Sequence, residues 1–198
     1  MKLTLSIVGD QLWKKIGESM DRVELRLRKT VSILETAGIP FAIVGGNAVR
    51  IWVAQVDPGA VRATNDVDVL IRPADLENVK RVMADNGYHY RKAAGLDMFL
   101  EGENDSVRYA IHIFLANRMV KQDDYESNPD LEPIEYGDGI RTLPLERLVR
   151  MKLNSFRLKD RVHLLDMIDV GLLSESWLAK FPKTLADRLR ALIENPDQ

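Results

Sequence analysis

The chain of 198 residues contains no cysteine, and none of its apolar runs is long enough to cross a bilayer. Without cysteine, the protein has no disulfide, no thiolate metal site and no cysteine nucleophile. The N-terminal segment MKLTLSIVGDQLW lacks the apolar core and the cleavage site of a secretory signal. We therefore expect a cytoplasmic protein.

A strong charge imbalance is also missing. The formal net charge is −2 at pH 7, which gives no overall attraction to nucleic acid. Hydrophobic residues make up 45% of the chain and charged residues 29%, as is typical of soluble globular proteins. The length fits one domain with a small helical annex, and we find no internal repeat or low-complexity segment.

The stretch from Phe41 to Ile71 carries most of the functional signal. It begins with an apolar run, residues 41–44, that is short enough for a buried strand. The run stops at Gly45 and Gly46, after which a helix over 47–56 is expected. A Gly-Gly turn lets the backbone approach a bulky anion, and free N–H groups at a helix start bind phosphate. A tight turn that needs positive φ explains the two glycines equally well.

Two acids open the next apolar run, residues 67–71. Because side chains alternate along a strand, Asp66 and Asp68 point to one face while Val67 and Val69 point to the core. Two carboxylates on one face repel each other unless a cation lies between them. Mg²⁺ is the expected ion, with Mn²⁺ as the alternative, because carboxylates and phosphate oxygens commonly hold it. Protection of a strand edge by charge is the simpler explanation of such a pair.

Taken together, GG…R-x-T-x-D-V-D-V-L resembles the signature of the DNA polymerase β-like nucleotidyltransferase superfamily. The nearest branch is the AbiEii-like, bacterial toxin-type nucleotidyltransferases. The matching residues are Gly45, Gly46, Ala48, Val49, Arg62, Thr64, Asp66 and Asp68. The resemblance implies that Asp66 and Asp68 hold the metal and that a nucleoside triphosphate is bound by Gly45, Gly46, Asn47, Arg62 and Thr64.

The remaining pattern predicts an α/β (α+β) fold with a small mixed sheet and helices on one side. Arg22, Arg26, Arg28 and Lys29 are interpreted as a solvated helix face. We divide the chain into a nucleotidyltransferase-like core, residues 1–143, and a C-terminal helical region, residues 144–198. The expected core elements are helices at 10–37 and 74–86 and strands at 88–92, 98–100 and 108–115.

The superfamily pattern places a third carboxylate on a later strand, and here that position holds His112. Alternation puts His112 on the face opposite Ile111 and Ile113, where the acid is expected. The replacement of this third carboxylate by histidine puts a full two-metal mechanism in question. An imidazole there can act as a base or as a metal ligand. A polar strand residue with no chemical role is an equally good interpretation.

Charge reverses sharply in the second half of the chain. Residues 123–138 carry seven acids and no Lys or Arg, which predicts a surface loop. Residues 141–161 carry seven basic residues against two acids. This block could hold a triphosphate or an RNA backbone, although a solvated helix face is the default interpretation.

Most of the basic block lies on one predicted helix that begins after Pro144 and ends near Gly171. Helical periodicity places Lys152, Lys159, His163 and Asp166 in one sector. Leu153, Leu158, Val162, Leu164, Leu165 and Ile168 point broadly the other way.

The same segment resembles the K…RxKD…D pattern of AbiEii-like proteins, with Lys152, Arg157, Lys159 and Asp160 at the matching positions. A lysine at position 152 would offset phosphate charge that develops in the transition state. The site acid of this segment remains open between Asp160, which follows the motif, and Asp166, which fits the helical face.

Our first hypothesis is a metal-dependent nucleotidyltransferase that moves a nucleoside monophosphate from NTP to a hydroxyl acceptor. Its catalytic residues would be Asp66, Asp68, Lys152, His112 and Asp160, and Lys152 and Lys159 would also contact the nucleotide. The acceptor would be RNA, protein or a small molecule, and the resemblance adds a toxin role with an antitoxin partner. The second hypothesis is an inactive nucleotide-binding or interaction protein on the same scaffold. A phosphoesterase is a third interpretation.

Overall fold

The computed structural model describes residues 10–93, 95–121, 124–132, 134–136 and 139–196. Seven strands in these ranges form one sheet in the order β3-β4-β5-β2-β1-β7-β6. They are β1 (Phe41–Val44), β2 (Val67–Ile71), β3 (His89–Ala93), β4 (Leu96–Leu100), β5 (Ile111–Leu115), β6 (Ile134–Tyr136) and β7 (Ile140–Thr142). Strand β2 is antiparallel to β1 and parallel to β5, so the predicted mixed sheet is confirmed.

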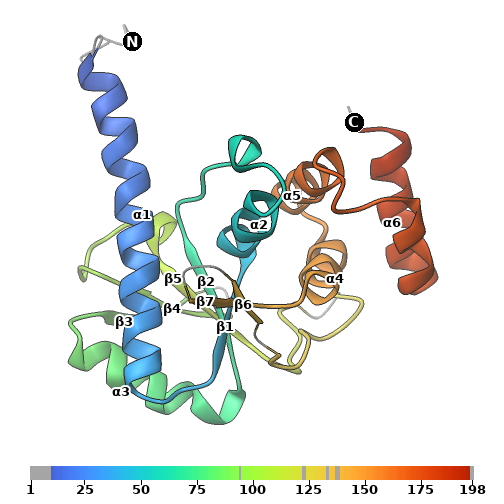
Figure 1. Ribbon diagram of the computed structural model, residues 1–198. Coiled ribbons are helices and arrows are strands. Elements are labelled where there is room, and N and C mark those ends of the chain that lie inside the picture. Colours follow the sequence, from blue (N-terminus) through green and yellow to red (C-terminus); the bar gives the residue numbers. More distant parts are fainter. Residues whose placement is uncertain (1–9, 94, 122–123, 133, 137–138, 197–198) are drawn as a thin grey trace, which may run out of the picture.

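The α-helices lie beside the sheet in two groups. The α-helices are α1 (Asp10–Thr36), α2 (Gly45–Ala54), α3 (Leu76–Asp85), α4 (Leu145–Ser155), α5 (Leu158–Asp169) and α6 (Lys183–Glu194). In the view of Figure 1, α1 and α3 lie to the left, whereas α2 and the C-terminal helices lie to the right. Helix α5 packs against α2, α4 and α6. Within the described ranges, no helix is long and apolar enough to cross a membrane.

The core lies around the two strands that carry the signature. Every residue of β1 is fully buried, and so are Val67, Val69 and Ile71 of β2. Helix α1 adds Leu27 and Leu34, which lie seven residues apart on one helical face. Burying one such aliphatic side chain stabilises the fold by roughly 2 kcal/mol.

Arg26 departs from the predicted solvated face of α1. Its side chain is only 8% exposed, and one guanidinium nitrogen donates to Glu101 at 3.3 Å. Another nitrogen donates to the Asn65 carbonyl at 3.5 Å. The prediction failed for Arg26 because α1 lies close to the segment that leads into β2, so this position faces the protein.

The single helix predicted after Pro144 is wrong, because the chain turns between α4 and α5. Phe156 adopts a left-handed conformation with φ of 43° and ends α4. The Asp160 carboxylate accepts the backbone N–H of Arg157 at 3.3 Å and so caps the new helix. As a result, Lys152 and Lys159 lie on different helices. Leu158, which was predicted on the core side, is 69% exposed.

Two other expectations concern the segment around β6 and the domain boundary. The acidic segment 123–138 contains β6, a strand that the loop prediction missed, and residues 123, 133, 137 and 138 lie outside the described ranges. The boundary between residues 143 and 144 stays a prediction.

Candidate active site

Two acids and a histidine meet at one end of β2. Asp66 directly precedes the strand, and the sheet register pairs Asp68 with Val44 on β1 and with His112 on β5. One ligand atom from each of Asp66, Asp68 and His112 lies within 4.8 Å of the others. The structure thus brings these three predicted residues together, and the cluster offers two carboxylates and one imidazole to a cation.

His112 is held by one of the two acids. Its Nδ1 lies 2.9 Å from Oδ1 of Asp68. Burial lowers the pKa of the His112 imidazole, but the bond to Asp68 and the charges of Asp68 and Asp66 raise it overall. This donor set fits a hard divalent ion, because carboxylate oxygens are its usual ligands and imidazole also ligates metals.

Asp66 is bonded to two side chains from distant parts of the chain. The Thr64 hydroxyl donates to Oδ1 at 2.7 Å, and Lys159 Nζ lies 3.0 Å from each carboxylate oxygen. Burial raises the pKa of Asp66, but Thr64 and Lys159 outweigh it and lower the pKa overall. The Lys159 ammonium therefore shares the carboxylate that a metal ion would use.

Replacing Lys159 with methionine is expected to move two affinities in opposite directions. Affinity for Mn²⁺ alone should rise about fivefold, because a half-exposed ion pair is worth up to about 1 kcal/mol. Affinity for NTP in the presence of Mn²⁺ should fall about tenfold, because a charged phosphate contact is lost. Calorimetric titration of wild type and Lys159→Met measures both, and a parallel change in the two affinities would contradict this role.

The paired glycines are required by contacts within the site. Gly45 has φ of +64°, and a Cβ on it would lie 1.7 Å from Oδ2 of Asp68. A Cβ on Gly46 would lie 2.6 Å from the Thr64 hydroxyl oxygen. Gly45 thus has the positive φ that one of the two sequence explanations requires, whereas approach of the backbone to a bulky anion stays a prediction. Any side chain at Gly45 would displace the Asp68 carboxylate.

Helix α2 starts at these glycines, so its N-terminal end lies beside Asp68 and Thr64. Its N-cap residue, Val44, makes no capping hydrogen bond with its side chain. The buried Asn47 side chain donates to the Asp66 carbonyl at 2.8 Å and accepts from Arg50 at 3.2 Å. Asn47 therefore fixes the backbone at Asp66, and its side chain is already hydrogen-bonded within the protein.

Lys152 and Asp160 form a buried ion pair between α4 and α5. Lys152 Nζ lies 3.1 Å from Asp160 Oδ1, and the side chains are 8% and 1% exposed. Ser155 and Arg157 donate to the other carboxylate oxygen at 2.6 and 2.9 Å. Burial raises the pKa of Asp160, but Lys152, Arg157 and Ser155 together lower it to about 2. Asp160 thus accepts from three side chains and is the partner of Lys152 in this ion pair.

Asp166, the other candidate acid, pairs with Arg62. The guanidinium donates in parallel to both carboxylate oxygens, at 2.9 and 2.8 Å. This bidentate pair connects the segment before β2 to α5. Neither Asp160 nor Asp166 belongs to the Asp66, Asp68 and His112 cluster, and each instead neutralises a cation beside it.

His163 is a buried residue of the site that was not among the predicted functional residues. Its ring is 5% exposed, and its Nδ1 has no hydrogen-bond partner. A Cβ on Gly46 would lie 3.5 Å from its Cε1, so the ring packs beside the start of α2. Burial lowers its pKa to about 4, with the charges of Lys152 and Lys159 adding to the shift. His163 shares its predicted helical sector with Lys159 and Asp166, and this was the sequence signal that could have identified it as a site residue.

His163 should make stability depend on pH. The unfolded imidazole titrates near 6.5 and the folded one near 4, so the unfolded state binds more protons between these values. The free energy of unfolding should be fully retained above pH 6.5 and should fall by about 3 kcal/mol toward pH 4. His163→Leu removes this contribution while Lys152, Lys159, Asp160 and Asp166 stay in place. Denaturant unfolding of both proteins at several pH values tests this, and parallel pH curves would rule it out.

Comparison with known proteins gives a likeness of fold. No family model and no curated protein matches the chain. The solution structure of the antibiotic-resistance factor ANT(2'')-Ia matches with a TM-score of 0.55 and 15% identity, covering 90% of this chain and 94% of that chain. The crystal structure of ANT(2'')-Ia in complex with adenylyl-2''-tobramycin matches with a TM-score of 0.44 and 13% identity, covering 86% of each chain. At this identity, the first likeness shows the fold alone. The chain therefore has a mixed α/β fold similar to that of the antibiotic-resistance factor ANT(2'')-Ia.

Proposed function

We propose that the protein is a metal-dependent nucleotidyltransferase that moves a nucleoside monophosphate from NTP to a hydroxyl acceptor and releases pyrophosphate. The observation that carries this proposal is the position of Asp66, Asp68 and His112 beside the uncapped start of α2. A divalent ion and a polyphosphate need these two features side by side. The ANT(2'')-Ia fold supports the proposal at the level of the scaffold.

Some residues of the site would bind the metal, and others would bind the phosphates. Asp66, Asp68 and His112 would hold Mg²⁺ or Mn²⁺, which polarises a phosphoryl oxygen when bound. The backbone N–H groups of Gly45, Gly46 and Asn47, at the start of α2, would bind phosphate oxygens.

Two cations complete this arrangement. Lys159 is half-exposed, so its ammonium can leave Asp66 for a phosphate once a metal neutralises the carboxylate. The buried Lys152 contributes positive charge that Asp160 keeps in place.

The transfer itself exchanges one P–O bond for another. The acceptor oxygen bonds to the α-phosphorus while the bond from that phosphorus to the bridging oxygen breaks. The electron pair leaves with pyrophosphate, and the acceptor proton passes to water. Negative charge grows on the phosphoryl oxygens, where Lys159 and the N–H groups of α2 offset it.

The proposal also covers the acceptor and the branch of the nucleotidyltransferase superfamily. The sequence resemblance supports an AbiEii-like branch and an RNA, protein or small-molecule acceptor. It also supports a toxin role with an antitoxin partner.

To test the transfer, NTP labelled on the α-phosphate is incubated with Mg²⁺ or Mn²⁺ and with separated RNA, protein and small-molecule fractions. We expect the label in one fraction together with released pyrophosphate. Release of labelled monophosphate into water alone would indicate a phosphoesterase instead.

A second candidate is a nucleotide-binding protein that transfers nothing, and His112 in place of the third carboxylate is its specific support. It predicts metal-dependent NTP binding without pyrophosphate release under any of the conditions above. Turnover with any fraction excludes it.

A further inference from the structure

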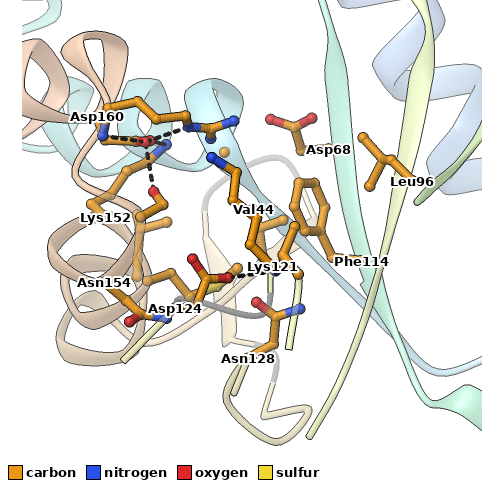
Figure 2. A pocket seen from close by; sticks show the side chains of 16 residues that line it. Val44, Asp68, Leu96, Phe114, Lys121, Asp124, Asn128, Lys152, Asn154 and Asp160 are labelled. Atoms are coloured by element: carbon orange, nitrogen blue, oxygen red, sulfur yellow. Dashed lines mark hydrogen bonds and ion pairs between the residues drawn. The ribbon is translucent and has the colours of Figure 1, made fainter. Parts of the chain in front are cut away.

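A recess opens directly beside the metal-site carboxylate Asp68 and runs between the sheet and α4 (Figure 2). In Figure 2, the Phe114 ring lies next to Asp68, between Val44 and Leu96. Leu148 and Met151 of α4 form the opposite wall. A group that occupies this recess would therefore lie against apolar walls and within reach of the reacting centre.

The segment Asp124–Asn128 closes the recess and is fixed to α4. The Asn154 amide donates to the Glu126 carbonyl at 2.7 Å, and its oxygen accepts the Glu126 N–H at 3.0 Å. Arg150 donates to both Glu126 carboxylate oxygens, at 2.9 and 3.0 Å. Asn154 lines the recess, and both the oxygen and the nitrogen of its side-chain amide are already hydrogen-bonded to Glu126.

Other polar side chains of the wall are also engaged. Asn128 is 7% exposed and donates to the Leu115 carbonyl at 3.0 Å. Asp124 accepts the Lys121 N–H at 2.9 Å, and Ser155 donates to Asp160 at 2.6 Å. These hydrogen bonds use much of the polar capacity of the wall, so it offers few hydrogen bonds to a ligand.

We propose that this recess receives the nucleobase of the NTP, and that it does so with weak selectivity among the four bases. This inference rests on the proposed function. Of the parts of an NTP, only the base has flat, weakly polar faces that suit apolar walls and an aromatic ring. Phosphates suit the charged part of the recess, where Lys152 and Arg157 pair with Asp160, better than the apolar part formed by Leu96 and Phe114.

The selectivity is expected to be weak because the polar groups of the wall already make hydrogen bonds within the protein. A site rejects the wrong ligand strongly only when unpaired buried groups need that ligand's hydrogen bonds. Apolar walls discriminate by only about tenfold to two-hundredfold. We expect the four NTPs to bind with affinities within about tenfold of one another.

The experiment is a calorimetric titration with Mn²⁺, using each NTP and inorganic tripolyphosphate as probes. In Phe114→Ala, affinity for every NTP should fall about tenfold or more, because base–aromatic stacking is worth roughly 1–3 kcal/mol. Affinity for tripolyphosphate, which has no base, should stay unchanged. Val120→Trp is a second variant, because the valine also lines the recess and is 44% exposed, so a larger ring there would fill part of the recess. It should give the same pattern without touching the core.

The outcomes separate this inference from the proposed function. The base site is overturned if both variants lose NTP and tripolyphosphate affinity equally, or if neither variant loses affinity. In either case, NTP binding by wild type still supports the proposed function. Preference of wild type for one NTP by more than about a thousandfold overturns the weak selectivity. If wild type binds tripolyphosphate and no NTP, the base site and the proposed function both fail.

Discussion

Asp68→Asn is expected to reduce nucleotidyl transfer by at least about a thousandfold, because a bound metal contributes several kcal/mol to transition-state stabilisation. Asparagine keeps the size of the side chain and can still bond to His112, whose Nδ1 lies 2.9 Å from the Asp68 carboxylate. The loss should therefore come from the missing charge. Initial rates of pyrophosphate release by wild type and Asp68→Asn measure it.

Two controls show whether the effect is specific. The thermal midpoint of Asp68→Asn should stay close to that of wild type. Asp85→Asn removes the same charge from an exposed carboxylate 3.6 Å from Arg81 and should leave the rate unchanged. Wild-type turnover in Asp68→Asn would exclude this carboxylate from the metal site.

Asp160→Asn is expected to destabilise the fold by about 3–5 kcal/mol, because it leaves the buried ammonium of Lys152 without its counter-charge. Asp160 is 1% exposed, and its carboxylate accepts hydrogen bonds from Lys152, Ser155 and Arg157. Urea unfolding of wild type and variant gives the difference in free energy.

Two further variants make this prediction specific to the buried pair. Asp187→Asn removes a carboxylate that pairs with Lys183 and Arg190 on the surface, and it should have no measurable effect on unfolding. Lys152→Met/Asp160→Leu replaces both charges with apolar groups and should recover much of the stability. Equal destabilisation by the single and the double substitution would show that the ion pair is not the cause.

Much of the fold around β1 and β2 could be predicted, because local patterns determine it. Period-two alternation predicted β2 at 67–71 and placed His112 on the face of Asp68, and the sheet register confirms both. The turn at Phe156 could not be predicted, because no glycine or proline marks it. A phenylalanine with φ of 43° is fixed there by tertiary packing and by the Asp160 cap.

The site was predictable where motifs carry it and unpredictable where partners come from distant segments. The sequence placed Lys159 near the nucleotide, but its pairing with Asp66 spans 93 positions. Arg62 and Asp166 lie 104 positions apart, so spacing gives no sign of their pair. Phe114 carries no motif, and its place beside Asp68 follows only from the order of β5 and β2 in the sheet.

The metal site is tested most directly by calorimetric titration of NTP into wild type and Asp66→Asn/Asp68→Asn, each with and without Mn²⁺ or Mg²⁺. We expect wild type to bind NTP more tightly with the metal and the double variant to show no such gain. Equal NTP binding by both proteins, with no effect of metal on either, would contradict a metal site at Asp66, Asp68 and His112.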